Sequence, residues 1–389
     1  MAAIVLVPGF MTPKNHKDLS KKYFGAALDV VVPGIPNVLS VRPSPCASLH
    51  DRAVEIFYEL KGGTTDYGEK HSKRHGHKRF GHVYSKPLFK EWSSKRPAHF
   101  VGHSLGGQTA RMLHFLLESG FFAEYGADAS WIKSITTISS PLNGAMSVYA
   151  LGAKSKQKEG ERSSVVPFSP GFCLGIFIHL YDYMYPSILK KYTFDFGMDH
   201  YTQDTSLKDL LHSIFVKSQM FEGEDSANFD MAPHIAREHN RVWKTLPCTY
   251  YFSFVGKLTK NEKERSQSVS HLIGFLFLTF LTWFVEILKW KHVCSSMPKG
   301  EAEERWNSGT DGLVTCISQA YPHIGPSGSV PKHRKIKSLA NLPSSPNPGC
   351  WYVIDVDTHH LGIVPFPSSY EKQRSFFIEL FNKLASLPP

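Results

Sequence analysis

The chain has 389 residues, of which 42% are hydrophobic and 20% are charged. This composition is typical of a folded globular protein and excludes an intrinsically disordered one. The formal net charge of +10 would attract a polyanion such as a nucleic acid. The Lys and Arg residues are nevertheless scattered, apart from a dense stretch over 70–78, and the sequence has no nucleic-acid recognition module. We therefore expect no nucleic-acid partner.

The cysteines and the first residues of the chain indicate a compartment. The six cysteines are widely spaced and form no CxxC pair, which indicates free thiols rather than a disulfide framework or a thiolate zinc site. The apolar stretch 4–7 has no basic region before it and is too short for a signal peptide. We therefore expect a cytoplasmic protein, with peripheral contact with membranes or lipid droplets left open.

Short β-branched segments alternate with longer amphipathic segments along the chain. This pattern predicts an α/β fold with a mostly parallel sheet and helices on its faces. The predicted strands cover residues 3–7, 38–41, 98–101, 134–138, 249–254 and 352–356. The predicted helices cover residues 48–60, 105–118 and 369–387. Ser48 is a candidate N-cap of the first helix, and glycines at 62 and 120 end the first two helices.

Three segments interrupt this alternation, and we interpret them as insertions into a single domain over residues 1–389. The first is a His-rich stretch at about 62–92. The second, at about 145–247, is a cap that holds the apolar stretch 172–185. The third, 272–288, is strongly apolar but contains Glu286, and it is shorter than the ~20 residues that cross a bilayer. We expect it to lie in a lipid interface or to be a buried cap helix.

A candidate nucleophile, Ser104, lies in the segment GHSLG at 102–106, which matches G-x-S-x-G. The pattern alone is weak, but a predicted strand leads into it and a predicted helix leads out, as a nucleophile elbow requires. The flanking glycines remove side chains that would collide at so sharp a turn. The backbone N–H groups of Leu105 and of Phe10, in the loop after the first strand, are candidate oxyanion donors. The alternative is a glycine-flanked turn with a bystander serine.

Several further segments resemble the thermoalkalophilic bacterial lipases and their staphylococcal relatives in the α/β-hydrolase superfamily. The resemblance covers most of the chain and is carried by GGTTDYG at 62–68, HSKRHGHKRFG at 71–81, GGQTARML at 106–113 and TTI at 136–138. It implies an α/β-hydrolase core, a mobile helical lid at 172–185, a zinc-bearing insertion, and hydrolysis of acylglycerol esters. At three places around the nucleophile the residues differ from the family's motif, which would change the side chains that surround the site. Pro8 replaces a His, Leu105 replaces a Gln, and PLNG at 141–144 replaces Pro-His-Asp-Gly.

Candidates for the acid and the base lie downstream of Ser104, in the order that this fold requires. The segment TDGLV at 310–314 resembles the acid loop of the family, which selects Asp311 as the orienting carboxylate. Asp-Gly is also common in type I turns, which is the alternative. The residues alone leave His359 and His360 as candidates for the base. The family has its base directly before a Leu, and this selects His360.

The His-rich stretch has two interpretations, a solvated basic loop or a metal site that takes carboxylates from elsewhere. The resemblance implies the metal site, with the histidines on a loop, and assigns the ligands to Asp51, His71, His77 and Asp225. Asp230 lies close to the last of these and is an alternative to it. Four protein ligands leave no position for water, so the implied zinc is structural. We expect no calcium, because the family's calcium ligands are replaced by Gly362 and by FPS at 366–368.

Together these features predict a lipase that hydrolyses long-chain acylglycerol esters at a lipid interface through a Ser-His-Asp triad and an acyl-enzyme. Two alternatives are kept. One is an esterase, phospholipase or acyltransferase that uses the same triad on another acyl substrate. The other is a non-catalytic, zinc-stabilised membrane-binding module.

Overall fold

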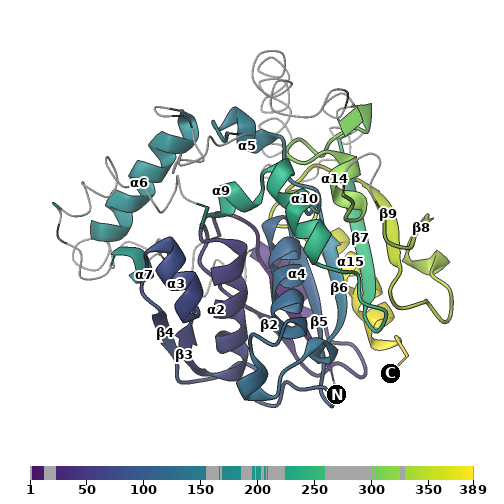
Figure 1. Cartoon of the computed structure of the whole chain (residues 1–389). Helices are drawn as coiled ribbons and strands as arrows, with labels where there is room; N and C mark the ends of the chain where they lie inside the picture. Colours follow the sequence, from purple (N-terminus) through teal and green to yellow (C-terminus); the bar gives the residue numbers. More distant parts are fainter. Residues whose placement is uncertain are drawn as a thin grey trace.

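The centre of the computed structural model is a seven-stranded sheet in the order β2-β1-β5-β6-β7-β9-β8, with every neighbouring pair parallel (Figure 1). The model describes residues 2–12, 23–154, 169–184, 195–197, 199–202, 224–258, 307–324 and 329–388, with residues 166, 206, 208, 300, 304 and 305. The strands are β1 (Ala3–Val7), β2 (Val38–Ser40), β5 (Ala98–His103), β6 (Ile132–Ile138), β7 (Tyr250–Lys257), β8 (His333–Ile336) and β9 (Trp351–Asp357).

The predicted α/β fold is confirmed, and all six predicted strands are present. The edge strand β8 was not predicted. Three of its four residues are exposed, so it lacks the apolar run by which a buried strand is recognised in a sequence.

Helices cover both faces of the sheet. On one face, α2 (Leu49–Lys61) and α4 (Leu105–Glu118) pack on Ala3, Val5 and Val7 of β1. On the other, α15 (Tyr370–Ala385) and the 3-10 helix Gly25–Asp29 pack on Ile4 and Leu6. Successive side chains of a strand point to opposite faces, so β1 contributes to both layers of core.

All three predicted helices are present, the predicted cap at Ser48 is confirmed, and a second polar cap is found at Ser369. The Ser48 side chain accepts the backbone N–H of Asp51 at the start of α2, and the Ser369 side chain accepts that of Lys372 at the start of α15. Gly62 ends α2 with φ 85°, a conformation that favours glycine. Within the described residues, the other 3-10 helices are Ala123–Tyr125, Ala129–Trp131 and Leu339–Asn341.

The His-rich insertion differs from the predicted loop. It contains an antiparallel hairpin, β3 (Gly63–Asp66) and β4 (Phe80–Tyr84), with α3 (Glu69–His75) between the two strands. His71 therefore lies on a helix, and only His77 lies on the loop that follows it. The helix starts after Gly68 and ends at Gly76, which has a left-handed conformation with φ 73°. These glycines were the signal for a short helix, which the basic composition obscured.

The cap contains α5 (Ser147–Ala150), α6 (Pro170–Met184), α7 (Asp199–Thr202), α9 (Ala227–Asp230) and α10 (Pro233–Val242), and α14 (Cys316–Ala320) lies beside β7 (Figure 1). The predicted apolar stretch 172–185 corresponds to α6. The apolar segment 272–288 lies outside the described residues. Within the described ranges, no helix combines the length and hydropathy that a membrane span requires.

Candidate active site and metal site

Ser104 lies on the sharp turn between β5 and α4. Its backbone has φ 53° and ψ −127°, a strained conformation for a residue with a side chain. A Cβ atom on Gly102 would lie 2.4 Å from the backbone of Gly106, and a Cβ on Gly106 would lie 2.1 Å from the backbone oxygen of Val7. Only glycine fits at either position, so both flanking glycines are needed for the turn.

The structure brings Asp311 and His360 together with Ser104. The Nε2 atom of His360 lies 2.9 Å from the hydroxyl oxygen of Ser104, and its Nδ1 lies 2.8 Å from Oδ2 of Asp311. The other carboxylate oxygen of Asp311 accepts the N–H groups of Leu313 and Val314, at 3.0 and 2.8 Å. All three side chains are buried. Because a carboxylate only accepts, Nδ1 carries the proton and Nε2 is free to accept from the serine hydroxyl.

The neighbouring His359 is not part of this chain of hydrogen bonds. Its Nδ1 accepts the backbone N–H of Leu361 at 3.1 Å, and the residue is fully buried. An acceptor already engaged by the backbone is unsuited to take a proton from the nucleophile. Of the two candidates for the base, the structure therefore brings His360 to Ser104.

The loop after β1 lies directly beside the nucleophile. A Cβ on Gly9 would lie 3.1 Å from the Cβ of Ser104. Among the described residues, neither the N–H of Phe10 nor that of Leu105 donates a hydrogen bond, so both are free for a ligand oxygen. The site opens into a pocket of about 460 Å³, whose apolar lining is Phe10, Met11, Leu313, Leu361, Pro365 and Phe366.

At two departures from the lipase pattern the residues present contact loops around the site. The carbonyl of Pro8 accepts a hydrogen bond from the buried guanidinium of Arg52 at 2.7 Å, which holds the loop after β1 through its backbone. The amide of Asn143 donates to the carbonyl of Tyr321 at 2.8 Å, and its oxygen accepts the N–H of His323 at 2.8 Å. Pro8 thus helps to hold one loop through its backbone carbonyl, and Asn143 holds another through its side-chain amide.

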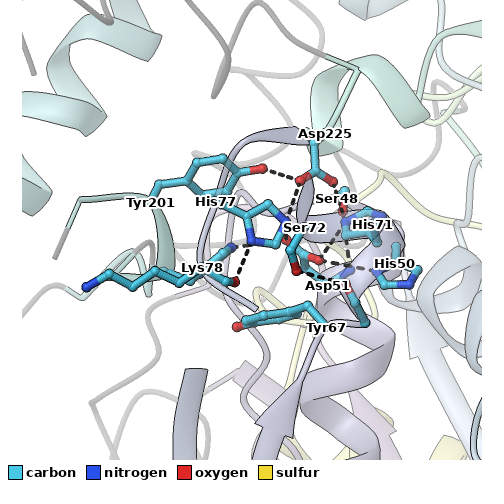
Figure 2. Close-up of polar contacts among 12 residues, drawn as sticks. Ser48, His50, Asp51, Tyr67, His71, Ser72, His77, Lys78, Tyr201 and Asp225 are labelled. Carbon is cyan, nitrogen blue, oxygen red and sulfur yellow. Dashed lines mark hydrogen bonds and ion pairs between the residues drawn. The ribbon is translucent and has the colours of Figure 1, made fainter. Parts of the chain in front are cut away.

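The four predicted metal ligands meet in one cluster. One ligand atom from each of Asp51, His71, His77 and Asp225 lies within 4.8 Å of the others (Figure 2). Nε2 of His71 lies 3.1 Å from Asp51 Oδ1 and 3.3 Å from Asp225 Oδ1, and Nε2 of His77 lies 3.4 Å from Asp225 Oδ2. Both Nε2 atoms and Asp225 Oδ1 are buried, and each lacks a well-formed hydrogen bond.

Hydrogen bonds from surrounding groups orient these ligands. The Nδ1 of His77 lies 2.8 Å from the carbonyl of Lys78, which leaves Nε2 to face the cluster (Figure 2). The hydroxyl of Tyr201 donates to Asp225, and Nε2 of His200 lies 3.0 Å from Asp51 Oδ2. Sequence reasoning missed His200 and Tyr201, because they lie in a short polar helix with no motif around them.

The electrostatics favour a cation at this cluster. Burial alone would raise the pKa of the Asp51 carboxyl, but hydrogen bonds with His200 and His50 and the contact with His71 hold it well below its ordinary value. For Asp225, burial and the Asp51 charge are likewise outweighed by His71 and His77, so its pKa is also lowered. Two carboxylates and two imidazoles that share one buried point form a group that could hold a metal ion.

The alternative ligand Asp230 has a different role. Its carboxylate accepts the backbone N–H of Leu49 at 2.6 Å, at the first residue of α2. Burial raises the pKa of Asp230 to about 8. Asp225, and not Asp230, is thus the residue that lies in the cluster.

The chain is similar to lipases of several bacteria. A family model described as "Lipase-like, C-terminal domain" matches residues 3–159. The lipase of Staphylococcus hyicus is 30% identical over 302 residues, which are 72% of this chain and 41% of that protein. A lipase of Staphylococcus epidermidis is 28% identical over 72% of this chain and 38% of that protein. The chain thus spans less than half the length of these curated relatives.

Solved structures show the same similarity over the whole chain. Lipase 1 from Pelosinus fermentans has a TM-score of 0.68 and 26% identity, and the match covers 100% of this chain and 99% of the other. The crystal structure of Staphylococcus hyicus lipase has a TM-score of 0.66 and 22% identity, over 99% and 95% of the two chains.

Proposed function

We propose that the chain, which is similar to the staphylococcal lipases, hydrolyses carboxylic esters of acylglycerols through Ser104, His360 and Asp311. One observation carries this proposal. The Ser104 hydroxyl donates to Nε2 of His360, and Nδ1 of His360 donates to Asp311, at a strained turn that faces an apolar pocket. A bystander serine in a glycine-flanked turn would have no reason to be paired with a buried imidazole and carboxylate.

The reaction follows from this geometry. The hydroxyl oxygen of Ser104 attacks the ester carbonyl carbon while Nε2 of His360 takes the hydroxyl proton, and Asp311 stabilises the imidazolium. The N–H groups of Phe10 and Leu105 donate to the oxyanion that forms on the carbonyl oxygen. The intermediate collapses as His360 gives its proton to the leaving alcohol oxygen. Water, deprotonated by His360, then releases the carboxylic acid from the acyl-enzyme.

The apolar surroundings of Ser104 favour a long acyl chain. The pocket is lined by aliphatic and aromatic side chains, and Phe366 at its edge is 38% exposed. Cap helix α6 packs through Ile178 in a cluster that also contains Phe10 and Met11, and its Phe177 is 56% exposed. A helix that shares a hydrophobic cluster with the loop after β1 and also presents aromatic surface suits a lid that opens at a lipid interface.

Active-site labelling with a fluorophosphonate tests the proposed nucleophile. The wild type should be labelled and should hydrolyse esters, whereas Ser104→Ala should do neither. Unlabelled wild-type protein that binds lipid vesicles would favour the non-catalytic module instead. A series of esters of increasing acyl length, measured below and above their solubility, distinguishes the lipase from an esterase. Activity that rises at the solubility limit and with long chains supports the lipase.

We also propose that the cluster of Asp51, His71, His77 and Asp225 binds one structural zinc ion. A tetrahedral zinc with bonds of about 2.0–2.1 Å would place its ligand atoms about 3.3 Å apart. The separations of 3.1, 3.3 and 3.4 Å agree with that spacing. Nε2 of His77 and Oδ2 of Asp51 lie 4.0 Å apart, so these two atoms would move closer together on binding. Elemental analysis of protein purified without chelator should find one zinc per chain. Calcium or no metal in its place would contradict the proposal.

A further inference from the structure

A second buried histidine of the site, His103, lies between two of its loops. Its Nε2 lies 2.9 Å from the backbone oxygen of His360, and its Nδ1 lies 2.5 Å from the hydroxyl of Tyr23. The Tyr23 hydroxyl accepts the backbone N–H of Gly9 at 3.0 Å. A continuous chain of hydrogen bonds therefore joins the loop after β1 to the backbone of the proposed base.

The chemistry at the two ends fixes the direction of each hydrogen bond in this chain. The oxygen of His360 only accepts, so Nε2 of His103 carries a proton. Burial lowers the pKa of His103 to about 3, so the ring is neutral and its Nδ1 is an acceptor. Burial raises the pKa of Tyr23 to about 12, so the phenol keeps its proton and donates it to Nδ1. With this arrangement of protons, each of these hydrogen bonds has one donor and one acceptor.

The peptide that follows Gly9 is held on its other side. The carbonyl oxygen of Gly9 accepts the hydroxyl of Thr12 at 3.2 Å. This carbonyl and the N–H of Phe10 belong to the same planar trans peptide, in which they point in opposite directions. Holding the carbonyl therefore aims the N–H. A Cβ on Gly9 would lie 2.8 Å from the Tyr23 hydroxyl, so the contact requires glycine at this position.

We propose that His103 and Tyr23 are positioning residues, which hold the base His360 and the oxyanion loop in one fixed geometry around Ser104. This inference rests on the proposed function. The backbone of His360 is held at both ends, because its N–H donates to the carbonyl of Asp311 at 2.8 Å and its carbonyl accepts from His103. A misplacement of about 1 Å costs roughly 100-fold in rate. Loss of these hydrogen bonds through His103 and Tyr23 should therefore lower kcat and leave KM for a monomeric ester unchanged.

Two amide replacements separate the two hydrogen bonds of His103. In His103→Gln the amide nitrogen reaches the position of Nε2 and keeps the bond to His360. In His103→Asn the amide oxygen lies near the position of Nδ1 and keeps only the bond to Tyr23. With a monomeric p-nitrophenyl ester, His103→Leu should lose about 10- to 100-fold in kcat. His103→Gln should recover most of this loss and His103→Asn little of it. Tyr23→Phe should lose about tenfold.

His99→Asn is the matched control. His99 lies on the same strand, is equally buried, and its Nδ1 lies 2.8 Å from the hydroxyl of Ser134, away from the site. At pH 8 this variant should keep wild-type kcat. Wild-type kcat in His103→Leu would overturn the inference, as would an equal loss in His99→Asn, or a His103→Gln variant no better than His103→Leu.

Two readouts separate this inference from the proposed function. If fluorophosphonate does not label the wild type, the proposed function fails. If it labels the wild type while His103→Leu keeps full kcat, only the positioning role fails. Nitrogen-15 spectra of histidine-labelled protein add a test that does not depend on activity. They should show His103 as the neutral ring protonated on Nε2 from about pH 5 to 8. A protonated ring, or the other tautomer, would contradict the assigned chain of hydrogen bonds.

Discussion

The proposed catalytic centre and the metal site both join residues far apart in the sequence, yet different kinds of structure support them. Ser104 follows β5, and its backbone N–H donates to the carbonyl of Ile138 on the neighbouring strand. His360 is tied to Asp311 through the backbone as well as the side chain. The catalytic centre is therefore held by the edge of the sheet and by backbone hydrogen bonds.

The metal site has no comparable frame. Asp51 lies on α2, His71 on α3, and Asp225 in the loop before α9. The contacts among these side chains are polar, and two carboxylates face the same buried point. The comparison teaches that the sheet determines the geometry of the proposed triad, whereas a cation at the cluster would join the insertion and the cap to the core. The two regions should then respond differently to substitution, chelation and acid.

The largest expected effect concerns the adjacent histidines. His360→Ala removes the base and should lower ester hydrolysis by roughly 10⁴-fold or more. His359→Ala should cost far less, because its imidazole accepts a backbone N–H and does not contact Ser104. Initial rates on a monomeric ester, measured on both variants at equal folded fraction, check this order. The reverse order would move the base by one residue.

Chelation should affect stability more than chemistry. Removal of the proposed zinc leaves Asp51 and Asp225 facing each other, so we expect a loss of about 3 kcal/mol or more in the free energy of unfolding. Part of the cost is offset by protonation of His71. Burial would lower the pKa of His71, but the nearby carboxylates of Asp225 and Asp51 outweigh it and raise that pKa to about 10 in the metal-free site. Urea unfolding with and without chelator measures the loss.

His77→Ala and His82→Ala form a matched pair within the insertion. His77 is in the cluster, whereas His82 is exposed on β4. His77→Ala should unfold like the chelated wild type and should not respond further to chelator. His82→Ala should behave as the wild type. If chelation abolished kcat at a temperature where the protein stays folded, the two regions would not be independent.

Acid should destabilise the sheet through buried neutral histidines. Burial lowers the pKa of His99 to about 3, whereas the unfolded chain binds a proton near pH 6.5. The unfolded state thus holds more protons, so the contribution of His99 is fully present above about pH 6.5 and is lost as the pH falls toward 3. Between about pH 6.5 and 5 the loss should approach about 2 kcal/mol.

The slope of unfolding free energy against pH reports the number of protons that the chain takes up on unfolding. The variant His99→Asn should lower this number by about one. The reduction should be the same in the presence of chelator, because His99 is remote from the metal cluster. The acid sensitivity of the metal site, which requires neutral imidazoles, should in contrast disappear with chelator. Unfolding by urea at a series of pH values separates the two contributions. If the slope of unfolding free energy against pH were unchanged in His99→Asn, the His99 imidazole would already be protonated in the native state.

The sequence predicted the parts of the molecule that depend on local patterns. The six apolar strands, the three helices and the elbow at Ser104 each have their signal within a few residues. The choice of His360 over His359 needed the family resemblance, and their roles stay predictions. Contacts between distant residues were not predictable from local patterns. His103 contacts His360 from 257 positions away, and His200 contacts Asp51 from 149 positions away.

The smallest predicted effect lies where the two regions meet, at the N-cap of α2. The Ser48 hydroxyl accepts the N–H of Asp51 at 3.2 Å, and the next residue, Arg52, holds the loop after β1. Ser369 caps α15 in the same way at 3.2 Å, far from the metal. Each serine-to-alanine change should cost about 1 kcal/mol.

The two cap variants should differ in their response to metal. Without metal, the first residues of α2 can unwind in Ser48→Ala, so the loss in the free energy of unfolding should be smaller. With metal bound, Asp51 must stay in place, so Ser48→Ala should lose the full amount, about 1 kcal/mol, of the free energy of unfolding. By linkage, the free energy of zinc binding should weaken by the difference between the losses with and without metal. Ser369→Ala should lose the same free energy in both states. Urea unfolding of both variants with and without chelator is the measurement. An equal loss for Ser48→Ala in the two states would mean that the packing of α2, rather than its cap, fixes Asp51.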